Sequence, residues 1–205
     1  MKKILFVVLI LVVLGTSAFA FDIKSFPSPI QKKDLLISPT FNLGRYYWRG
    51  ATIGATIGID YALPINFALT VGGEAGFAFP TSTYYNSGYG SRDTMRQIAI
   101  PIMVRAAWHP NFEVPNLDVY AIIKLGMAIG LLTNKPEYYK GRSGFAGGGN
   151  VGVRYFFGPK FGLFGELGWD SYNVGIKYTG PYSGYWYSPT LWMGTFFHLG
   201  ITFKV

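Results

Sequence analysis

Two histidines, in a chain without cysteine, are the side chains of this 205-residue sequence best suited to nucleophilic or metal chemistry. His109 precedes Pro110, which predicts a turn, and His198 lies in a strongly alternating segment near the end of the chain. Neither stands beside a serine nucleophile, and no His-x-x-x-His pair or acidic cluster offers metal ligands. We therefore expect no catalytic residues, no metal site and no cofactor.

Six charged residues occupy equivalent positions in segments of alternating polarity. They are Asp60, Glu74, Arg105, Lys124, Arg154 and Glu166. Their neighbours on the same face are mostly glycine, alanine, threonine and asparagine, and the mixed signs allow pairing between adjacent strands. The pattern predicts a buried ion-pair network. The alternative is a gate, in which a glutamate of this set exchanges between its cations to open a small pore.

Aromatic and basic residues gather in the longer connections between those segments. The candidates for a surface site are Arg45, Tyr47, Trp48, Arg49, Tyr85, Arg92, Tyr139, Lys140, Arg142, Tyr185 and Trp186. Tyr and Trp prefer the headgroup zone of a bilayer, so one interpretation is an anchoring girdle. The other is a ligand or adhesion surface, whose Arg and Lys side chains contact anionic groups.

The first twenty residues have the three parts of a secretory signal peptide. Lys2 and Lys3 supply its positive charge, 4–14 is an apolar run, and Ala18-Phe19-Ala20 fits signal peptidase. The run is shorter than the roughly 20 residues that span a bilayer, so an anchor is disfavoured. We expect cleavage after residue 20, a flexible leader over 21–34, and one domain over 35–205.

Alternation of apolar and small or polar residues organises the rest of the chain. The predicted strands are Leu35–Leu43, Ile53–Tyr61, Phe67–Phe79, Met95–Trp108, Leu117–Leu132, Phe145–Phe156, Phe161–Tyr178 and Leu191–Val205. Pro101 is unusual inside a strand, and the pattern of the seventh segment changes parity around Ser171. That change predicts a bulge or a strand that leaves the membrane.

Eight such segments joined by alternately short and long connections predict an all-β fold, an eight-stranded antiparallel up-and-down transmembrane β-barrel. The rival is a soluble barrel of lipocalin type with the aliphatic face inside. A soluble exterior needs about a quarter charged residues, whereas the second face here has about one charge per strand. Small residues suit a crowded eight-stranded lumen, which places the aliphatic face against lipid.

The signal, the eight segments and the closing Phe197-His198-Leu199-Gly200-Ile201-Thr202-Phe203-Lys204-Val205 resemble the small outer-membrane β-barrel proteins, the group of the OmpA transmembrane domain, OmpX and OmpW. In that group a terminal aromatic residue is read by the barrel-assembly machinery. Here the last residue is Val205, and the aromatic is displaced to Phe203. The resemblance is architectural and implies a fold rather than a specific role.

These observations predict a non-enzymatic protein of the outer membrane of a diderm, Gram-negative-type bacterium, with a structural or surface-interaction role. The expected partners are outer-membrane lipid, lipopolysaccharide, the assembly machinery and a host or surface ligand. Export argues against nucleic acid despite the net charge of +8. Two alternatives stay open: a narrow channel for small solutes, and a lipid-modifying enzyme, which the histidine positions disfavour.

Overall fold

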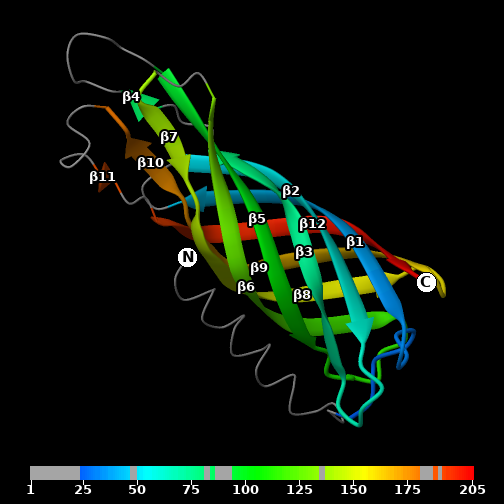
Figure 1. The fold of residues 1–205 in the computed structure, drawn as a ribbon. Coiled ribbons are helices and arrows are strands. Elements are labelled where there is room, and N and C mark those ends of the chain that lie inside the picture. The colour runs from blue at the N-terminus through cyan, green and yellow to red at the C-terminus, as the bar shows by residue number, and fades with distance from the viewer. Residues whose placement is uncertain are drawn as a thin grey trace, which may run out of the picture.

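Eight long strands close into an antiparallel barrel in the described part of the chain (Figure 1). The computed structural model describes residues 24–46, 50–80, 84–85, 94–133, 137–180, 187–188 and 191–205. The barrel strands are β1 (Leu35–Tyr46), β2 (Gly50–Ala62), β3 (Leu69–Pro80), β5 (Thr94–Trp108), β6 (Leu117–Thr133), β8 (Gly144–Phe156), β9 (Phe161–Asn173) and β12 (Leu191–Lys204). Each pairs with its neighbours along the chain, and β1 pairs with β12 to close the barrel. The predicted all-β, eight-stranded, up-and-down barrel is confirmed.

Four short strands extend one end of the barrel. β4 (Tyr84–Tyr85) pairs with β5, while β7 (Tyr139–Arg142), β10 (Gly175–Tyr178) and β11 (Tyr187–Ser188) form a separate three-stranded sheet. We call this end, at the upper left of Figure 1, the loop end. The opposite, turn end carries the connections 63–68, 109–116 and 157–160. Both Leu35 and Val205 lie at the turn end, where their backbones hydrogen-bond to each other.

Two stretches predicted as loop are strand in the structure. Arg45 and Tyr46 continue β1, where they pair with both β2 and β12, and Tyr139–Arg142 forms β7. Residues Asp170, Ser171 and Tyr172 are buried in succession, which matches the predicted change of parity. Beyond Asn173 the chain leaves the barrel wall as β10 and pairs with β7. In these segments, antiparallel pairing therefore continues beyond the alternating apolar residues from which the strands were predicted.

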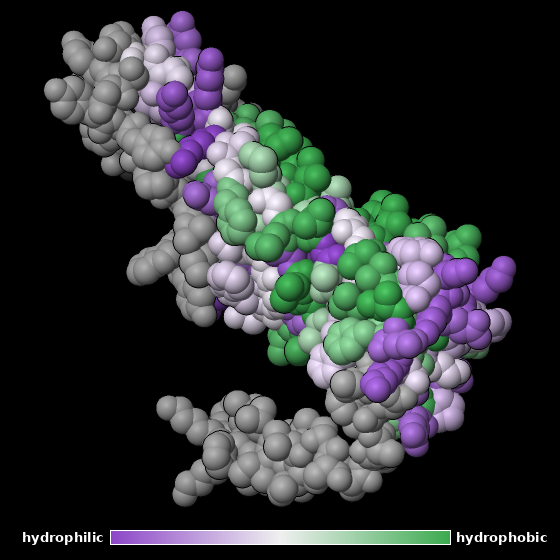
Figure 2. Space-filling view, turned by 60° about the horizontal axis from the view of Figure 1, so that its bottom comes forward, coloured by the Kyte–Doolittle hydropathy of each residue, from purple (hydrophilic) through white to green (hydrophobic). Residues whose placement is uncertain are grey.

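The outer wall of the barrel is apolar and the lumen is not. Val104 is 68% exposed, whereas its neighbours in sequence, Met103 and Arg105, are buried on the lumen side. The same contrast runs through every barrel strand, and Figure 2 shows apolar side chains over the middle of the visible face with polar residues at its two ends. An apolar wall of this kind suits lipid and excludes the soluble, lipocalin-type alternative. No helix in the described residues is long and apolar enough to cross a membrane.

Pro101 is accommodated inside β5 at a local break in one ladder. It pairs with Ala128 of β6, but on the other side the register passes from Ala75–Ile102 to Ala78–Ala99. Because proline has no N–H to donate, the ladder to β3 is interrupted there while the ladder to β6 continues. The strand predicted across Pro101 is confirmed.

Candidate functional site

Glycine on the lumen face makes room for the long polar side chains of the opposite strands. A Cβ on Gly58 would collide with the Arg105 guanidinium, and one on Gly152 would collide with the Tyr120 ring. The lumen of an eight-stranded barrel is only wide enough to be filled by side chains, so each bulky residue needs a small neighbour. The alternation that makes the strands therefore also places the charged groups inside.

A first cluster, the central network, consists of Asp60, Glu74, Arg105, Lys124, Asp170 and His198. Arg105 bridges two carboxylates, with Nε 2.8 Å from Asp60 and Nη1 2.9 Å from Glu74. Lys124 bridges Glu74 at 3.4 Å and Asp170 at 2.8 Å. Each cation thus contacts two acids, and each acid is drawn from a different strand.

His198 completes the central network from β12. Its Nε2 lies 3.3 Å from Asp170 Oδ2, and its Nδ1 lies 2.7 Å from Asn42 Oδ1 on β1. The ring stacks on Phe196, with ring centroids 5.8 Å apart. His198 therefore faces the lumen, on the inward side of the strongly alternating segment in which it lies.

A second cluster, the turn-end cluster, consists of His109, Asp118 and Arg154 with the hydroxyl of Thr70. Asp118 accepts from Arg154 Nη1 at 3.0 Å and lies 2.8 Å from His109 Nδ1. The Arg154 guanidinium also stacks over the Tyr120 ring, 4.8 Å from its centroid, in a cation–π contact. His109 was predicted to be a turn residue, and it does begin the 109–116 connection, but its ring is buried and contacts Asp118 and Thr70.

Thr70, His109 and Asp118 form a hydroxyl–imidazole–carboxylate series. Thr70 Oγ1 lies 2.9 Å from His109 Nε2, and His109 Nδ1 lies 2.8 Å from Asp118 Oδ1. A nucleophile, a base and an orienting acid follow one another in the same order in hydrolases. Thr70 as a residue is 1% exposed, and His109 and Asp118 are buried as well. A substrate therefore has no approach to this oxygen in the structure.

Glu166 joins neither cluster through an ion pair in the described residues. It accepts hydrogen bonds from the Tyr120 hydroxyl at 2.8 Å and from Asn150 Nδ2 at 3.0 Å. Neutral donors hold this carboxylate in place, so it is not poised to move between cations. Of the two glutamates that the gate hypothesis could use, Glu166 has no ion-pair partner in the described residues, whereas Glu74 contacts both Arg105 and Lys124.

Toward the loop end, apolar residues fill the lumen. They are Ala78, Ala99, Met103, Ala128, Ala146, Tyr172, Val174 and Phe196. All are buried, as are the charged residues below them. These residues form one apolar cluster on the loop-end side of the central network.

The structure places the six predicted lumen charges inside the barrel but divides them. Asp60, Glu74, Arg105 and Lys124 meet in the central network, Arg154 lies in the turn-end cluster, and Glu166 stands apart. Sequence reasoning missed four participants: Asp118, Asp170, His109 and Tyr120. Asp118 and Asp170 fall on the even-numbered, lumen side of their strands, and that parity could have identified them.

The loop candidates are only partly covered by the structure. Tyr47, Trp48, Arg49, Arg92, Tyr185 and Trp186 lie outside the described residues, and for Tyr85 only the backbone is described. Arg45 is exposed on the wall of β1, and Tyr139, Lys140 and Arg142 form β7. The structure thus brings the last three together and separates Arg45 from them.

The sheet of β7, β10 and β11 presents a basic face. Lys140 lies directly opposite Lys177, which sequence reasoning had not singled out, and Arg142 follows two residues along the same side. The other side carries the rings of Tyr139 and Tyr178, whose centroids are 5.2 Å apart. We call Lys140, Lys177 and Arg142 the basic face.

A closed, eight-stranded antiparallel barrel with an apolar wall and a packed polar lumen is the fold of the small outer-membrane β-barrel proteins. Among solved structures, the chain is similar to a major outer membrane protein of Thermus thermophilus, with a TM-score of 0.56 and 14% identity over 85% of this chain and 100% of that one. It is similar to Neisserial surface protein A, with a TM-score of 0.52 and 12% identity over 84% and 95%. No protein-family model and no curated protein matches the sequence. At such identities the likeness establishes the fold alone.

Proposed function

We propose that this chain is a non-enzymatic integral protein of a bacterial outer membrane that binds an anionic lipid or glycan surface through its loop end. Residues 1–20 would direct its export and be cleaved. Outer-membrane barrels have short periplasmic turns and long outer loops, so the turn end faces the periplasm and the loop end faces outward. The packed lumen supports a role at the surface rather than transport through the barrel.

The basic face is the observation that carries this proposal. Like charges directly opposite each other on paired strands destabilise a sheet. Lys140 and Lys177 are both exposed, and the ion pairs of the described residues include neither of them. The two opposed ammonium groups repel each other, which lowers the stability of the sheet. An anion that contacts both groups would relieve this repulsion, so the pair is suited to bind one.

Phosphate on lipopolysaccharide is the anion best placed to meet this face. β7 directly precedes β8 in the chain and β10 directly follows β9, at the loop end of both wall strands. The basic face therefore lies beyond the lipid-facing belt, where headgroups gather. Lys and Arg both bind phosphate oxygens through charge-assisted hydrogen bonds. The Tyr139 and Tyr178 rings on the reverse side are suited to the interface itself.

Removal of the two opposed lysines tests the proposal. Folded protein immobilised in detergent should capture phosphatidylcholine liposomes that contain lipid A, and Lys140→Gln/Lys177→Gln should weaken this capture at least about tenfold at low salt. Lys32→Gln/Lys160→Gln removes the same charge at the turn end and is the matched control. Equal capture by both variants would contradict the proposal, as would equal capture of liposomes without lipid A by the unmodified protein.

A narrow channel gated by lumen ion pairs is the alternative, and bilayer conductance tests it. Because apolar residues fill the lumen above the central network, we expect only background current from the purified protein in planar bilayers. Glu74→Ala and Arg105→Ala should also give background current whenever they fold. Discrete conductance steps that appear with Glu74→Ala would instead favour the gate.

A further inference from the structure

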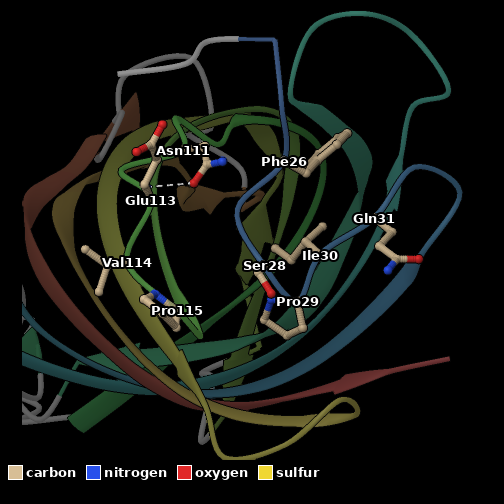
Figure 3. A pocket seen from close by; sticks show the side chains of 9 residues that line it. All are labelled: Phe26, Ser28, Pro29, Ile30, Gln31, Asn111, Glu113, Val114 and Pro115. Atoms are coloured by element: carbon tan, nitrogen blue, oxygen red, sulfur yellow. Dashed lines mark hydrogen bonds between the residues drawn. The ribbon is translucent and has the colours of Figure 1, made fainter. Parts of the chain in front are cut away.

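Residues 24–34 cross the turn end of the barrel as a strap (Figure 3). In the close-up, Phe26, Ser28, Pro29 and Ile30 come from this segment and lie over the mouth that the strands surround. The connection between β5 and β6, with Asn111, Glu113, Val114 and Pro115, faces them from the other side. Sequence reasoning placed this segment in a flexible leader, and the structure gives its described part definite contacts.

One apolar side chain anchors the strap in the barrel. Ile30 is 2% exposed and packs in a cluster with Leu36, Ala62 and Phe156, against which Phe26 is also packed. Two lysines add polar ties: Lys204 Nζ donates to the Pro29 carbonyl at 2.7 Å, and Lys32 Nζ donates to Asn66 Oδ1 at 2.9 Å. These contacts hold the middle of the strap to β12 and to the connection between β2 and β3.

A backbone connection fixes the end of the strap that enters β1. The Lys33 amide donates to the Ala62 carbonyl at 2.8 Å, and the Ala62 amide donates to the Asp34 carbonyl at 2.9 Å. Lys33 has a φ of 75°, so the chain turns sharply where it enters β1. Residues 33–34 are therefore fixed to the end of β2.

Grooves flank the strap on both sides. A groove of about 420 Å³ separates it from Asn111, Glu113, Val114 and Pro115, and another of about 610 Å³ lies toward Asn66. Phe26, Ile30 and Gln31 line both. A permanent plug would be packed on all sides, as interiors are. This strap instead has grooves beside it, and its apolar contacts are those of Phe26 and Ile30 with the barrel.

The turn-end cluster lies directly beneath the strap. The centroids of the Phe26 and His109 rings are 6.1 Å apart. His109, Asp118 and Arg154 are each at most 1% exposed. An ion-paired group at the mouth of a barrel would normally contact periplasmic water. Here the cluster is buried, and the strap contacts it through Phe26 and His109.

We propose that residues 24–34 are a hinged closure of the periplasmic mouth, which swings about residues 33–34 and exposes the turn-end cluster when it lifts. With the strap down, the lumen is sealed at this end. With the strap up, His109, Asp118 and Arg154 become the floor of a vestibule open to the periplasm. The closed apolar layer toward the loop end is unaffected by this motion, so the vestibule is a blind one.

Chemical labelling of histidine tests the closure, because the chain has only two histidines. Diethyl pyrocarbonate should label His109 slowly in the folded protein, and Ile30→Asp should speed this labelling at least tenfold by removing the anchor. His198, deep in the lumen between Asn42 and Asp170, should stay slow in both proteins. Gln31→Ala alters an exposed strap residue and should leave both rates unchanged. Peptide mass spectrometry distinguishes the two sites.

Three results would overturn the closure: fast labelling of His109 in the unmodified protein, slow labelling in folded Ile30→Asp, or fast labelling of both histidines in that variant. The last result would mean that the whole barrel had loosened. If Ile30→Asp does not fold, Ile30→Ala is judged by the same criteria. A folded barrel is recognised throughout by its altered migration on a gel without heating.

Discussion

Replacing Arg105 with methionine should lower the free energy of unfolding by about 3–5 kcal/mol, the cost of leaving a buried charge without its partner. Arg105 contacts both Asp60 and Glu74, and all three side chains are buried. Its loss leaves the Asp60 and Glu74 carboxylates in a narrow lumen, and of these two only Glu74 keeps a cation, Lys124. Urea unfolding of the protein reconstituted in lipid vesicles measures the change.

Two further variants separate the ion pairs from simple packing. Arg45→Ala removes an exposed arginine and should change the free energy of unfolding by less than about 0.5 kcal/mol. The triple variant Asp60→Asn/Glu74→Gln/Arg105→Met removes the charges together and should recover at least half of the loss, because no carboxylate of that group stays uncompensated. A triple variant as unstable as Arg105→Met would show that the side-chain shape of arginine matters more than its charge.

Gly152→Val should prevent folding or lower the free energy of unfolding by about 3 kcal/mol. The added Cβ would collide with the Tyr120 ring, and that ring is held by its hydrogen bond to Glu166 and by the Arg154 guanidinium. The ring therefore has little freedom to move aside. The fraction of protein that migrates as a folded barrel on an unheated gel, followed by urea unfolding, measures the effect.

Gly149→Val is the matched control on the same strand. Gly149 faces the outer wall of β8, where the nearest atom to a new Cβ is the Ile122 carbonyl oxygen at 3.6 Å. An apolar, β-branched side chain is favourable on a lipid-facing strand, so this variant should fold as well as the unmodified protein. Equal damage from both substitutions would mean that β8 is sensitive to any change of glycine rather than to crowding in the lumen.

The strands and their two faces could be predicted from the sequence because both depend on local alternation. Each barrel strand lies where apolar residues recur at every second position, and the outward series of β6 is exposed as expected. The strand extensions could not be predicted in the same way. Tyr139–Arg142 has no apolar alternation of its own and becomes β7 by pairing with β10.

The partners inside the lumen could be predicted only in part. Alternation tells which side chains point inward, but the stagger of the strands decides which of them meet, and no single strand encodes the stagger. Arg105 lies opposite Lys124 in the register of β5 and β6, yet both cations turn to acids on other strands. The proline after His109 correctly indicated the end of β5, but nothing in the local sequence indicated that the His109 ring would be buried against Asp118.

The central network also bears on how such a barrel enters a membrane. Its members come from β2, β3, β5, β6, β9 and β12, and His198 contacts Asn42 across the β1–β12 closure. A partly assembled sheet would hold several of these charges without partners in hydrocarbon, where they are costly. Charge neutralisation is then complete only when β2 through β12 have come together, and the His198–Asn42 contact is added when β1 meets β12. Half-inserted intermediates are disfavoured. Insertion should be a single concerted transition, in which β1 and β2 enter the hydrocarbon layer together with β12.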